Sequence, residues 1–424
     1  MKQFMQIVYM LFFISLLLQK GYPQTMADWQ TSDPFSQAKF VPDIAAIVDV
    51  TYVQRSLDDV THYEIPGFKD AHSKPSNHEN HEDELNQNNG FNLNYVEISL
   101  YSQVDPFFDM FAVLHASTEG AEIEEAYFTT QQLPFGFKIK GGKFLSSIGR
   151  LNDKHAHDWD FADLPLVYKA FFGSQLNEIG IQLNWIVPLP FYMLIGAEAL
   201  RGENETSFGT NGFTVENITT IDDANKPNVY TAFVKSSFDI GNYTVLAGVS
   251  GIYGTSRIDH GIGNDTNVAG DHGFYGKTYM AIGDITIRYD FNSYQYIYLQ
   301  TEYIYRNQDG DLYSYDGSIN SKSNFDAKQS GLYTQVVARL NQLWRIGLRY
   351  DLLAQNDVST NHDLTNNLPR YSSMIEYNPS EFSRFRLQYN YDKSLYSESG
   401  TNKPNHEIIV QANITIGAHG AHSF

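Results

Sequence analysis

Apolar and polar residues alternate almost without error over the last part of the chain, residues 405–424. Successive side chains of a β-strand point to opposite faces, so this segment predicts a strand with one apolar and one polar face. The apolar face carries Ile408, Val410, Ala412, Ile414, Ile416 and Ala418. Similar alternation recurs along the chain and predicts sixteen strands, at residues 42–53, 91–102, 106–117, 121–131, 135–144, 178–187, 190–200, 228–239, 242–253, 273–290, 294–306, 328–340, 341–353, 369–378, 383–393 and 405–424.

The connections between these strands alternate between short and long. The short ones carry Pro, Asn or Gly, which tight turns favour. An even number of strands, with short turns at one end and long loops at the other, is typical of outer-membrane barrels. The predicted fold class is all-β: a transmembrane antiparallel β-barrel of about 16 strands (14–18, because strand ends are uncertain), with short periplasmic turns and long extracellular loops. The long connections run over 54–90, 145–177, 201–227, 254–272, 307–327, 354–368 and 394–404.

The charged faces of these strands are expected to point into the barrel. Within residues 341–353, Ile346 and Leu348 share one face, and Arg345 and Arg349 share the other. An Arg or Lys that faces lipid at mid-membrane costs roughly 2–4 kcal/mol, so the charged face must line the lumen. A soluble all-β protein is the alternative. It would have to bury the apolar faces of all these strands in more than one sandwich.

The N-terminus predicts a secretory signal peptide over residues 1–27. A positive residue precedes the apolar run from Phe4 to Leu18, and small residues offer a cleavage site that ends at Ala27. A membrane anchor is the alternative, but the run is shorter than the roughly 20 residues that a spanning helix needs. Beyond the signal we expect a periplasmic N-terminal segment at 28–41 and the barrel at 42–424.

Composition agrees with a barrel and excludes other classes. The chain contains 29 Tyr and 28 Phe, and the aromatic girdles of outer-membrane barrels use such residues. The net charge of −20 excludes a nucleic-acid partner, because phosphates require a basic face. It suits acidic loops among outer-membrane lipid and lipopolysaccharide. The chain has no cysteine, which excludes a disulfide framework.

The long connection at residues 145–177 differs from the others because it carries an apolar run, Leu164 to Phe172. We expect such a loop to fold against the inner wall rather than extend into water. Its carboxylates would then face lumenal Lys and Arg, and rings of charge sort ions in many pores. The predicted pore constriction consists of the loop residues Asp153, Asp158, Asp160 and Asp163 and the wall residues Lys138, Lys140, Arg288, Arg339, Arg345, Arg349 and Arg386.

The residues around this loop also carry a motif. It comprises Lys138-Ile139-Lys140-Gly141-Gly142-Lys143-Phe144, then Ile148-Gly149-Arg150-Leu151-Asn152 and Asp163-Leu164-Pro165. This stretch of about 60 residues resembles Gram-negative outer-membrane porins, of the phosphate- or carbohydrate-selective type, and uncharacterised zinc-regulated outer-membrane proteins. The resemblance implies a water-filled channel and, for porins of this size, a homotrimer. A phosphate channel is expected to carry a strongly basic binding ladder, which acidic residues dilute here.

Histidines beside carboxylates form a second set of candidate sites. Imidazole together with carboxylate suits zinc, and no other cofactor is expected. The candidate ligands are His155, His157 and Asp158 in the inserted connection and His72, His78 and His81 in the first long loop. The alternative is that these are polar loops without a metal.

These observations favour a porin in the outer membrane of a Gram-negative bacterium, through which small polar or charged solutes diffuse. A zinc-binding outer-membrane receptor or uptake protein is the alternative. A ligand-gated active receptor would need a plug domain, and the first strand begins near residue 42. An enzyme is not expected, because no strand places Ser and His together on its inward face. The final residue, Phe424, resembles the terminal aromatic signal that the barrel-assembly machinery reads.

Overall fold

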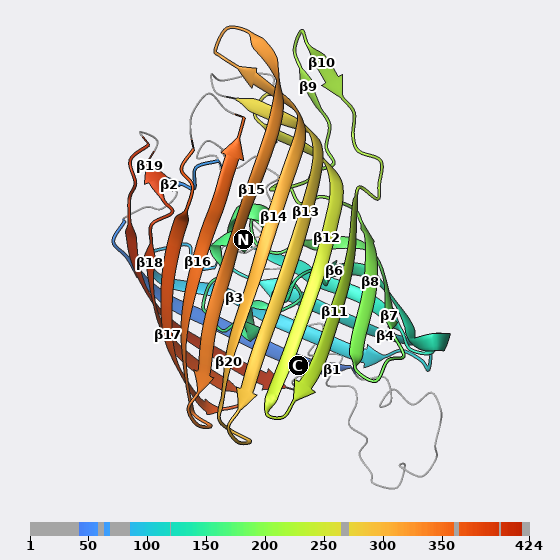
Figure 1. Ribbon diagram of the computed structural model, residues 1–424, viewed down its shortest axis with the longest axis vertical. Helices are drawn as coiled ribbons and strands as arrows, with labels where there is room; N and C mark the ends of the chain where they lie inside the picture. Colours follow the sequence, from blue (N-terminus) through green and yellow to red (C-terminus); the bar gives the residue numbers. More distant parts are fainter. Residues whose placement is uncertain are drawn as a thin grey trace, which may run out of the picture.

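Sixteen antiparallel strands close into a single barrel (Figure 1), which confirms the predicted fold. The computed structural model describes residues 42–57, 63–67, 85–118, 120–263, 271–359, 364–397 and 400–417. The predicted signal peptide, the 28–41 segment, His72, His78, His81 and Phe424 lie outside these residues. The barrel strands are β1 (Asp43–Arg55), β3 (Gly90–Gln103), β4 (Phe108–Ala116), β5 (Ala121–Thr130), β6 (Phe137–Leu145), β7 (Asn177–Ile186), β8 (Tyr192–Leu200), β11 (Val229–Ile240), β12 (Tyr243–His260), β13 (His272–Asp290), β14 (Tyr296–Tyr315), β15 (Asn320–Arg339), β16 (Trp344–Val358), β17 (Leu368–Ser380), β18 (Ser383–Asp392) and β20 (Asn405–Gly417).

Each barrel strand pairs with its neighbours along the chain, and the last strand closes the ring. β20 pairs with β1, so that Ile414 lies opposite Val48 and Gln411 lies opposite Thr51. Because every strand then has two partners, the barrel has no open edge with unpaired backbone groups. Closure of this kind is what a sheet in lipid requires.

The outside of the barrel is apolar and the inside is polar, the reverse of a soluble protein. On β7, Ile181 is 62% exposed, whereas the next residue, Gln182, is fully buried. On β18, Leu387 is 49% exposed, and its neighbours Arg386 and Gln388 are buried. Lipid is the solvent that such an exterior requires. The alternation therefore assigns the strand faces as the sequence pattern predicts.

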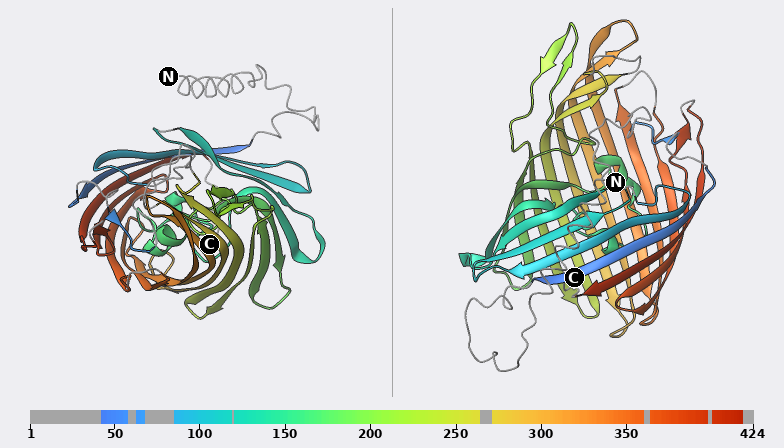
Figure 2. Two further views of the ribbon diagram at one scale, coloured as in Figure 1. Left: turned by 90° about the horizontal axis from the view of Figure 1, so that it is seen from above. Right: turned by 180° about the vertical axis from the view of Figure 1, so that it is seen from behind.

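The wall is much taller on one side than on the other (Figures 1 and 2). Strands β4 to β8 have 9 or 10 residues, close to the roughly 9–11 that cross a membrane when tilted. Strands β12 to β15 have 18 to 20 residues and extend well beyond that thickness. The sequence pattern predicts loops at 254–272 and 307–327, but the strands continue to His260 and Tyr315. Outside the membrane both faces of a strand can be polar, so the alternation that marks a strand disappears.

The connections contain short elements. A helix, α2 (Leu166–Phe172), lies inside the ring of strands (Figure 2) and contacts β15 and β16. No helix in the described part of the chain is long and apolar enough to cross a membrane. Within the described residues, the remaining elements are the 3₁₀ helices η4 (Pro134–Gly136) and η5 (Ala156–Asp158), the hairpin of β9 (Phe213–Val215) with β10 (Thr219–Ile221), and β2 (Tyr63–Glu64), which pairs with β19 (Tyr396–Ser397).

Candidate functional site: the loop inside the barrel

The connection between β6 and β7, residues 146–176, enters the lumen and returns to the wall; we call it the inserted loop. Asn152 joins its two ends. The Asn152 side-chain amide donates to the carbonyl oxygens of Ser146 at 2.8 Å and Leu176 at 3.0 Å. The Oδ1 atom of Asn152 accepts from the backbone N–H of Leu176 at 2.8 Å. The neck of the loop is therefore held closed.

The apolar part of the inserted loop packs against the inner wall. Every residue of α2 except Lys169 is buried. Tyr168 and Phe171 belong to one hydrophobic cluster with the wall residues Ile304 and Leu353. Burying one large apolar side chain contributes about 1.5–3 kcal/mol. Several such side chains thus favour the docked position over an extension into water.

A glutamate of the wall accepts hydrogen bonds from the loop backbone. The two carboxylate oxygens of Glu302, in β14, lie 2.8 Å from the backbone N of Arg150 and 3.0 Å from that of Leu151. The hydroxyls of Tyr168 and Tyr333 donate to the same carboxylate at 3.0 and 2.5 Å. A hydrogen bond within a protein contributes about 0.5–1.5 kcal/mol net. This one side chain therefore links the start of the loop and α2 to the wall.

Two further wall carboxylates act in the same way. Glu198, in β8, accepts from the backbone N–H of Ser147 at 2.9 Å and from the hydroxyl of Ser146. Asp351, in β16, accepts from the backbone N–H of Leu166 at 3.1 Å. The wall thus contacts the loop through acidic side chains as well as through the basic ones predicted from the sequence.

Asp163, predicted for the constriction, lies in a buried cluster of charges. Its carboxylate oxygens are each 2.8 Å from a guanidinium nitrogen, one of Arg349 and one of Arg370. Both arginines also pair with Asp351, at 3.0 and 3.2 Å. Burial alone would raise the pKa of Asp163, but Arg370 and Arg349 outweigh it and hold that pKa well below its usual range. Two anions and two cations are thus balanced out of contact with water.

Asp160 lies in a second group of paired charges. It pairs with Arg345, and Arg345 also lies 2.9 Å from Glu376 of β17. Arg386 is 2.7 Å from the other oxygen of Glu376 and donates to the carbonyl of Trp159 at 2.8 Å. These guanidinium groups hold the loop, and the buried Arg386 is closed to a passing solute.

Asp153 differs because it remains in contact with solvent at the edge of the inserted loop. Its Oδ2 atom is 3.4 Å from Nζ of Lys235, in β11, and the two side chains are 32% and 20% exposed. Burial alone would raise the pKa of Asp153, but Lys235, Lys154 and Arg150 lower it. Asp153 therefore stays ionised at neutral pH and forms an accessible charge pair with the wall.

The other predicted constriction residues are spread along the lumen. The guanidinium carbon of Arg288 lies 4.2 Å from the centre of the Tyr296 ring. Arg339 donates to carbonyl groups of the turn between β15 and β16. The remaining ones are exposed or half-buried: Lys138, Lys140 and Asp158. The structure thus distributes the predicted residues among buried pairs, the edge of the loop and the wall, and whether they select ions stays a prediction.

A separate group of histidines and glutamates lies between the inserted loop and strands β3 to β5. One ring nitrogen of His155 is 3.0 Å from Glu124, and the other is 2.9 Å from Glu125. Nδ1 of His157 is 3.0 Å from Glu97. Burial alone would lower the pKa of His155, but Glu124 and Glu125 outweigh it and hold that pKa well above its usual value.

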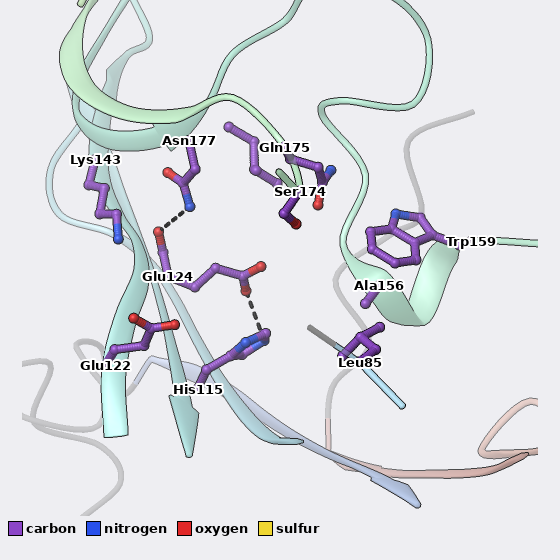
Figure 3. A pocket seen from close by; sticks show the side chains of 11 residues that line it. Leu85, His115, Glu122, Glu124, Lys143, Ala156, Trp159, Ser174, Gln175 and Asn177 are labelled. Carbon is purple, nitrogen blue, oxygen red and sulfur yellow. Dashed lines mark hydrogen bonds and ion pairs between the residues drawn. The ribbon is translucent and has the colours of Figure 1, made fainter. Parts of the chain in front are cut away.

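His115, in β4, completes this group and borders a small cavity (Figure 3). Its Nε2 atom is 2.9 Å from Glu124 and 3.4 Å from Glu97. The predicted ligands His155 and His157 are thus brought together with wall glutamates. Asp158 lies at the margin, 3.7 Å from Nε2 of His157.

Several residues of this site were not singled out from the sequence. Arg370 has the lumenal phase of β17, opposite to the exposed Tyr371 and Ile375, so period-two counting could have found it. The role of Glu302 could not be found in this way, because half of its partners are backbone N–H groups. Acidic residues inside the strand predicted at 121–131 are the sequence signal that marks the histidine–glutamate group.

Comparison with known proteins extends these observations. No protein-family model matches the chain. It is 44% identical over 415 residues to an uncharacterised protein of Aquifex aeolicus (strain VF5), an alignment that covers 97% of this chain and 85% of that protein.

Solved structures of porins share the fold. The outer-membrane channel DcaP of Acinetobacter baumannii superposes with a TM-score of 0.52 at 11% identity, covering 89% of this chain and 98% of that one. The anion-selective porin from Comamonas acidovorans gives a TM-score of 0.50 at 9% identity, covering 88% of this chain and 99% of that one. OmpT of Vibrio cholerae, in its trimer form, gives 0.50 at 8% identity, covering 89% and 99%. The chain therefore belongs to the family of the Aquifex aeolicus protein, and it has the closed β-barrel fold of the porins.

Proposed function

We propose that this protein is a channel through which small polar or charged solutes diffuse across the outer membrane. The single observation that carries this proposal is the inserted loop, which is bound to the inner wall of a closed barrel by wall carboxylates and by its own apolar helix. A loop held in this way narrows a lumen without depending on a ligand. Polar and charged side chains line the lumen, which suits hydrated solutes.

The accessible charges, rather than the buried pairs, are the ones that we assign to selectivity. The clusters around Asp163 and Glu376 are neutralised internally and are out of reach of a solute. Asp153 and Lys235 keep contact with water at the edge of the loop. A solute that passes the loop meets this pair, and charged rims of this kind discriminate between ions.

Planar-bilayer recording with a salt gradient tests both statements. The refolded full-length protein is expected to give steady open steps. Lys235→Gln is expected to shift the reversal potential towards cation preference, and Asp153→Asn towards anion preference. Asp326→Asn is a matched control, because Asp326 pairs with Lys328 at a site where both side chains are about half exposed. Identical reversal potentials in all four proteins would contradict the assignment of the selective pair.

We also propose that the barrel assembles as a homotrimer. The likeness to OmpT of Vibrio cholerae, solved in a trimer form, supports this proposal. The mass of the detergent-solubilised complex, measured by light scattering with the detergent contribution subtracted, is expected to equal three chains. A complex with the mass of one chain would contradict it.

A further inference from the structure

Among the described residues, only one group of contacts between the inserted loop and the wall combines histidines with glutamates. We call it the His–Glu cluster; its members are Glu97, His115, Glu124, Glu125, His155 and His157. Three strands of the wall and the turn around η5 contribute to it. Eight residues after His155, Asp163 faces arginines instead.

The carboxylates of this cluster are buried next to imidazoles. Glu97, Glu124 and Glu125 are 3%, 8% and 4% exposed, and each lies within hydrogen-bond distance of a histidine ring nitrogen. Burying a carboxylate is costly unless a cation pairs with it. Protonated imidazoles can supply this charge when no metal is bound. A divalent cation could take their place, because it would neutralise two carboxylates and use the imidazoles as neutral ligands.

The ligand atoms are also close enough for one ion. One potential ligand atom each from Glu97, Glu124 and His155 lies within 4.8 Å of the other two. Imidazole nitrogen with carboxylate oxygen is a donor set of zinc and similar transition metals. Calcium and magnesium prefer sites of oxygen alone, so the histidines argue against them.

A cavity beside the cluster leaves room for a water molecule in the coordination shell. Its volume is about 30 Å³, and His115, Glu124, Trp159 and Asn177 are among the residues that line it (Figure 3). A single ordered water needs about 10–15 Å³. The buried Oδ1 atom of Asn177 has no hydrogen-bond partner among the described residues, which a water in this cavity would provide.

We propose that Glu97, Glu124 and His155 bind one divalent transition-metal ion of the zinc class, with His115 and His157 available to complete its shell. The ion ties the η5 turn of the inserted loop to strands β3–β5. This assigns the zinc indicated by the sequence to a structural and regulatory role in the channel wall, rather than to capture by a receptor. Only the effect on conductance rests on the proposed function.

Calorimetry with zinc on the refolded full-length protein tests the binding. The histidines of the first long loop are removed first, as His72→Asn, His78→Asn and His81→Asn, so that they cannot contribute. In this background we expect one zinc ion per chain. Adding Glu124→Gln or His155→Asn should weaken its affinity at least tenfold. His260→Asn is the matched control, because His260 contacts His272 elsewhere in the barrel and should leave the affinity unchanged.

X-ray absorption at the zinc edge needs only the background protein, so it tests the site even if a variant of the cluster fails to fold. Mixed nitrogen and oxygen ligands, with at least one imidazole, are expected. The proposal would be overturned if removing the three loop histidines abolished all zinc binding. It would also be overturned if adding Glu124→Gln left the zinc affinity of the background protein unchanged.

Conductance separates this proposal from the proposed function. Micromolar zinc should change the size or the noise of the open steps in the background protein and leave Glu124→Gln unaffected. Zinc binding to the cluster without any conductance would refute the channel but keep the metal site. Conductance that zinc leaves unchanged, with no calorimetric binding, would refute the metal site alone.

Discussion

Replacing Asp163 by Asn should loosen the inserted loop more than any change to a surface charge. The carboxylate accepts from Arg349 and Arg370, each at 2.8 Å, and from Gln388 at 2.7 Å. Asp163→Asn leaves two buried guanidinium groups with one carboxylate, that of Asp351. Removing one partner of a buried ion pair costs about 3–5 kcal/mol, which is a factor of roughly 10² to 10³ or more in the equilibrium between docked and undocked loop.

Limited trypsin digestion of the refolded barrel measures this equilibrium. The loop contains Lys154 and the helix residue Lys169, both half-buried, and a protease can bind the backbone there only when the loop undocks. When reclosing is faster than cleavage, the rate follows the open population. Cleavage in Asp163→Asn should therefore be at least about 100-fold faster than in the unmodified protein. Asp326→Asn removes an exposed pair worth about 0–1 kcal/mol and serves as the control. Equal rates in the two variants would refute the buried-pair reasoning.

A second substitution sharpens this test. Asp163→Asn combined with Arg370→Gln leaves one cation, Arg349, with one anion, Asp351, so the cluster is balanced again. The double variant should be more stable than the sum of the two single effects implies, by about 0.5–3 kcal/mol. Strict additivity would show that charge balance does not hold the loop.

The pH dependence follows from the lowered pKa of Asp163. A carboxylate whose folded-state pKa is lowered contributes stability that is complete above its unfolded pKa of about 3.9 and is lost as pH falls through the folded value. The difference in loop stability between the unmodified protein and Asp163→Asn should thus be constant from about pH 5 to 7 and shrink below about pH 4. Digestion rates of both proteins, measured with pepsin at acidic pH and with trypsin at neutral pH, would show this. A stability difference that vanishes near pH 6 would contradict it.

Two further substitutions test other contacts of the loop. Glu302→Gln replaces one acceptor oxygen by an NH₂ group that faces the donors of Arg150, Leu151 and two tyrosines. This should destabilise the docked loop by about 1–3 kcal/mol. Trypsin cleavage at Lys154 should accelerate, and an unchanged rate would count against the role of Glu302. Phe171→Ala empties a fully buried position and should cost about 3–5 kcal/mol; thermal unfolding followed by near-UV circular dichroism should show the loss, whereas an unchanged transition would mean that α2 does not support the barrel.

The fold could be predicted because lipid imposes a strict rule on each strand. Where a wall crosses the membrane, as at Ile181 and Leu387, every second residue must be apolar. Beyond the membrane the rule lapses, and the upper part of β14, Asn307 to Tyr315, was predicted as a loop although it is paired strand. The membrane-spanning part of each strand was therefore predictable, and its projecting part was not.

The candidate site was predictable only in part, for a different reason. Period-two counting placed Arg345 and Arg349 in the lumen, and the structure pairs them with Asp160 and Asp163. Period-two counting cannot reveal whether such a pair is buried or exposed to water, because that depends on how the loop folds. The wall carboxylate Glu302 binds backbone N–H groups, which no sequence pattern displays.

The histidine–glutamate group shows how a local irregularity hides a site. Glu124 and Glu125 are consecutive and both buried, which regular alternation forbids. A shift in register between β4 and β5, at Val113 and Leu114, makes it possible. Such bulges re-aim side chains, and one of them here turns two acidic residues towards His155.

Cysteine accessibility at the edge of the inserted loop tests the channel most directly, because the chain has no cysteine of its own. Asp153→Cys places one thiol beside Lys235, where the native side chain is 32% exposed. A bulky, charged thiol reagent added during planar-bilayer recording should reduce the open current in discrete steps. The same reagent should leave the unmodified protein and Asp326→Cys unchanged. Complete labelling of Asp153→Cys with an unchanged current, or no current in any of the three proteins, would contradict a channel narrowed by this loop.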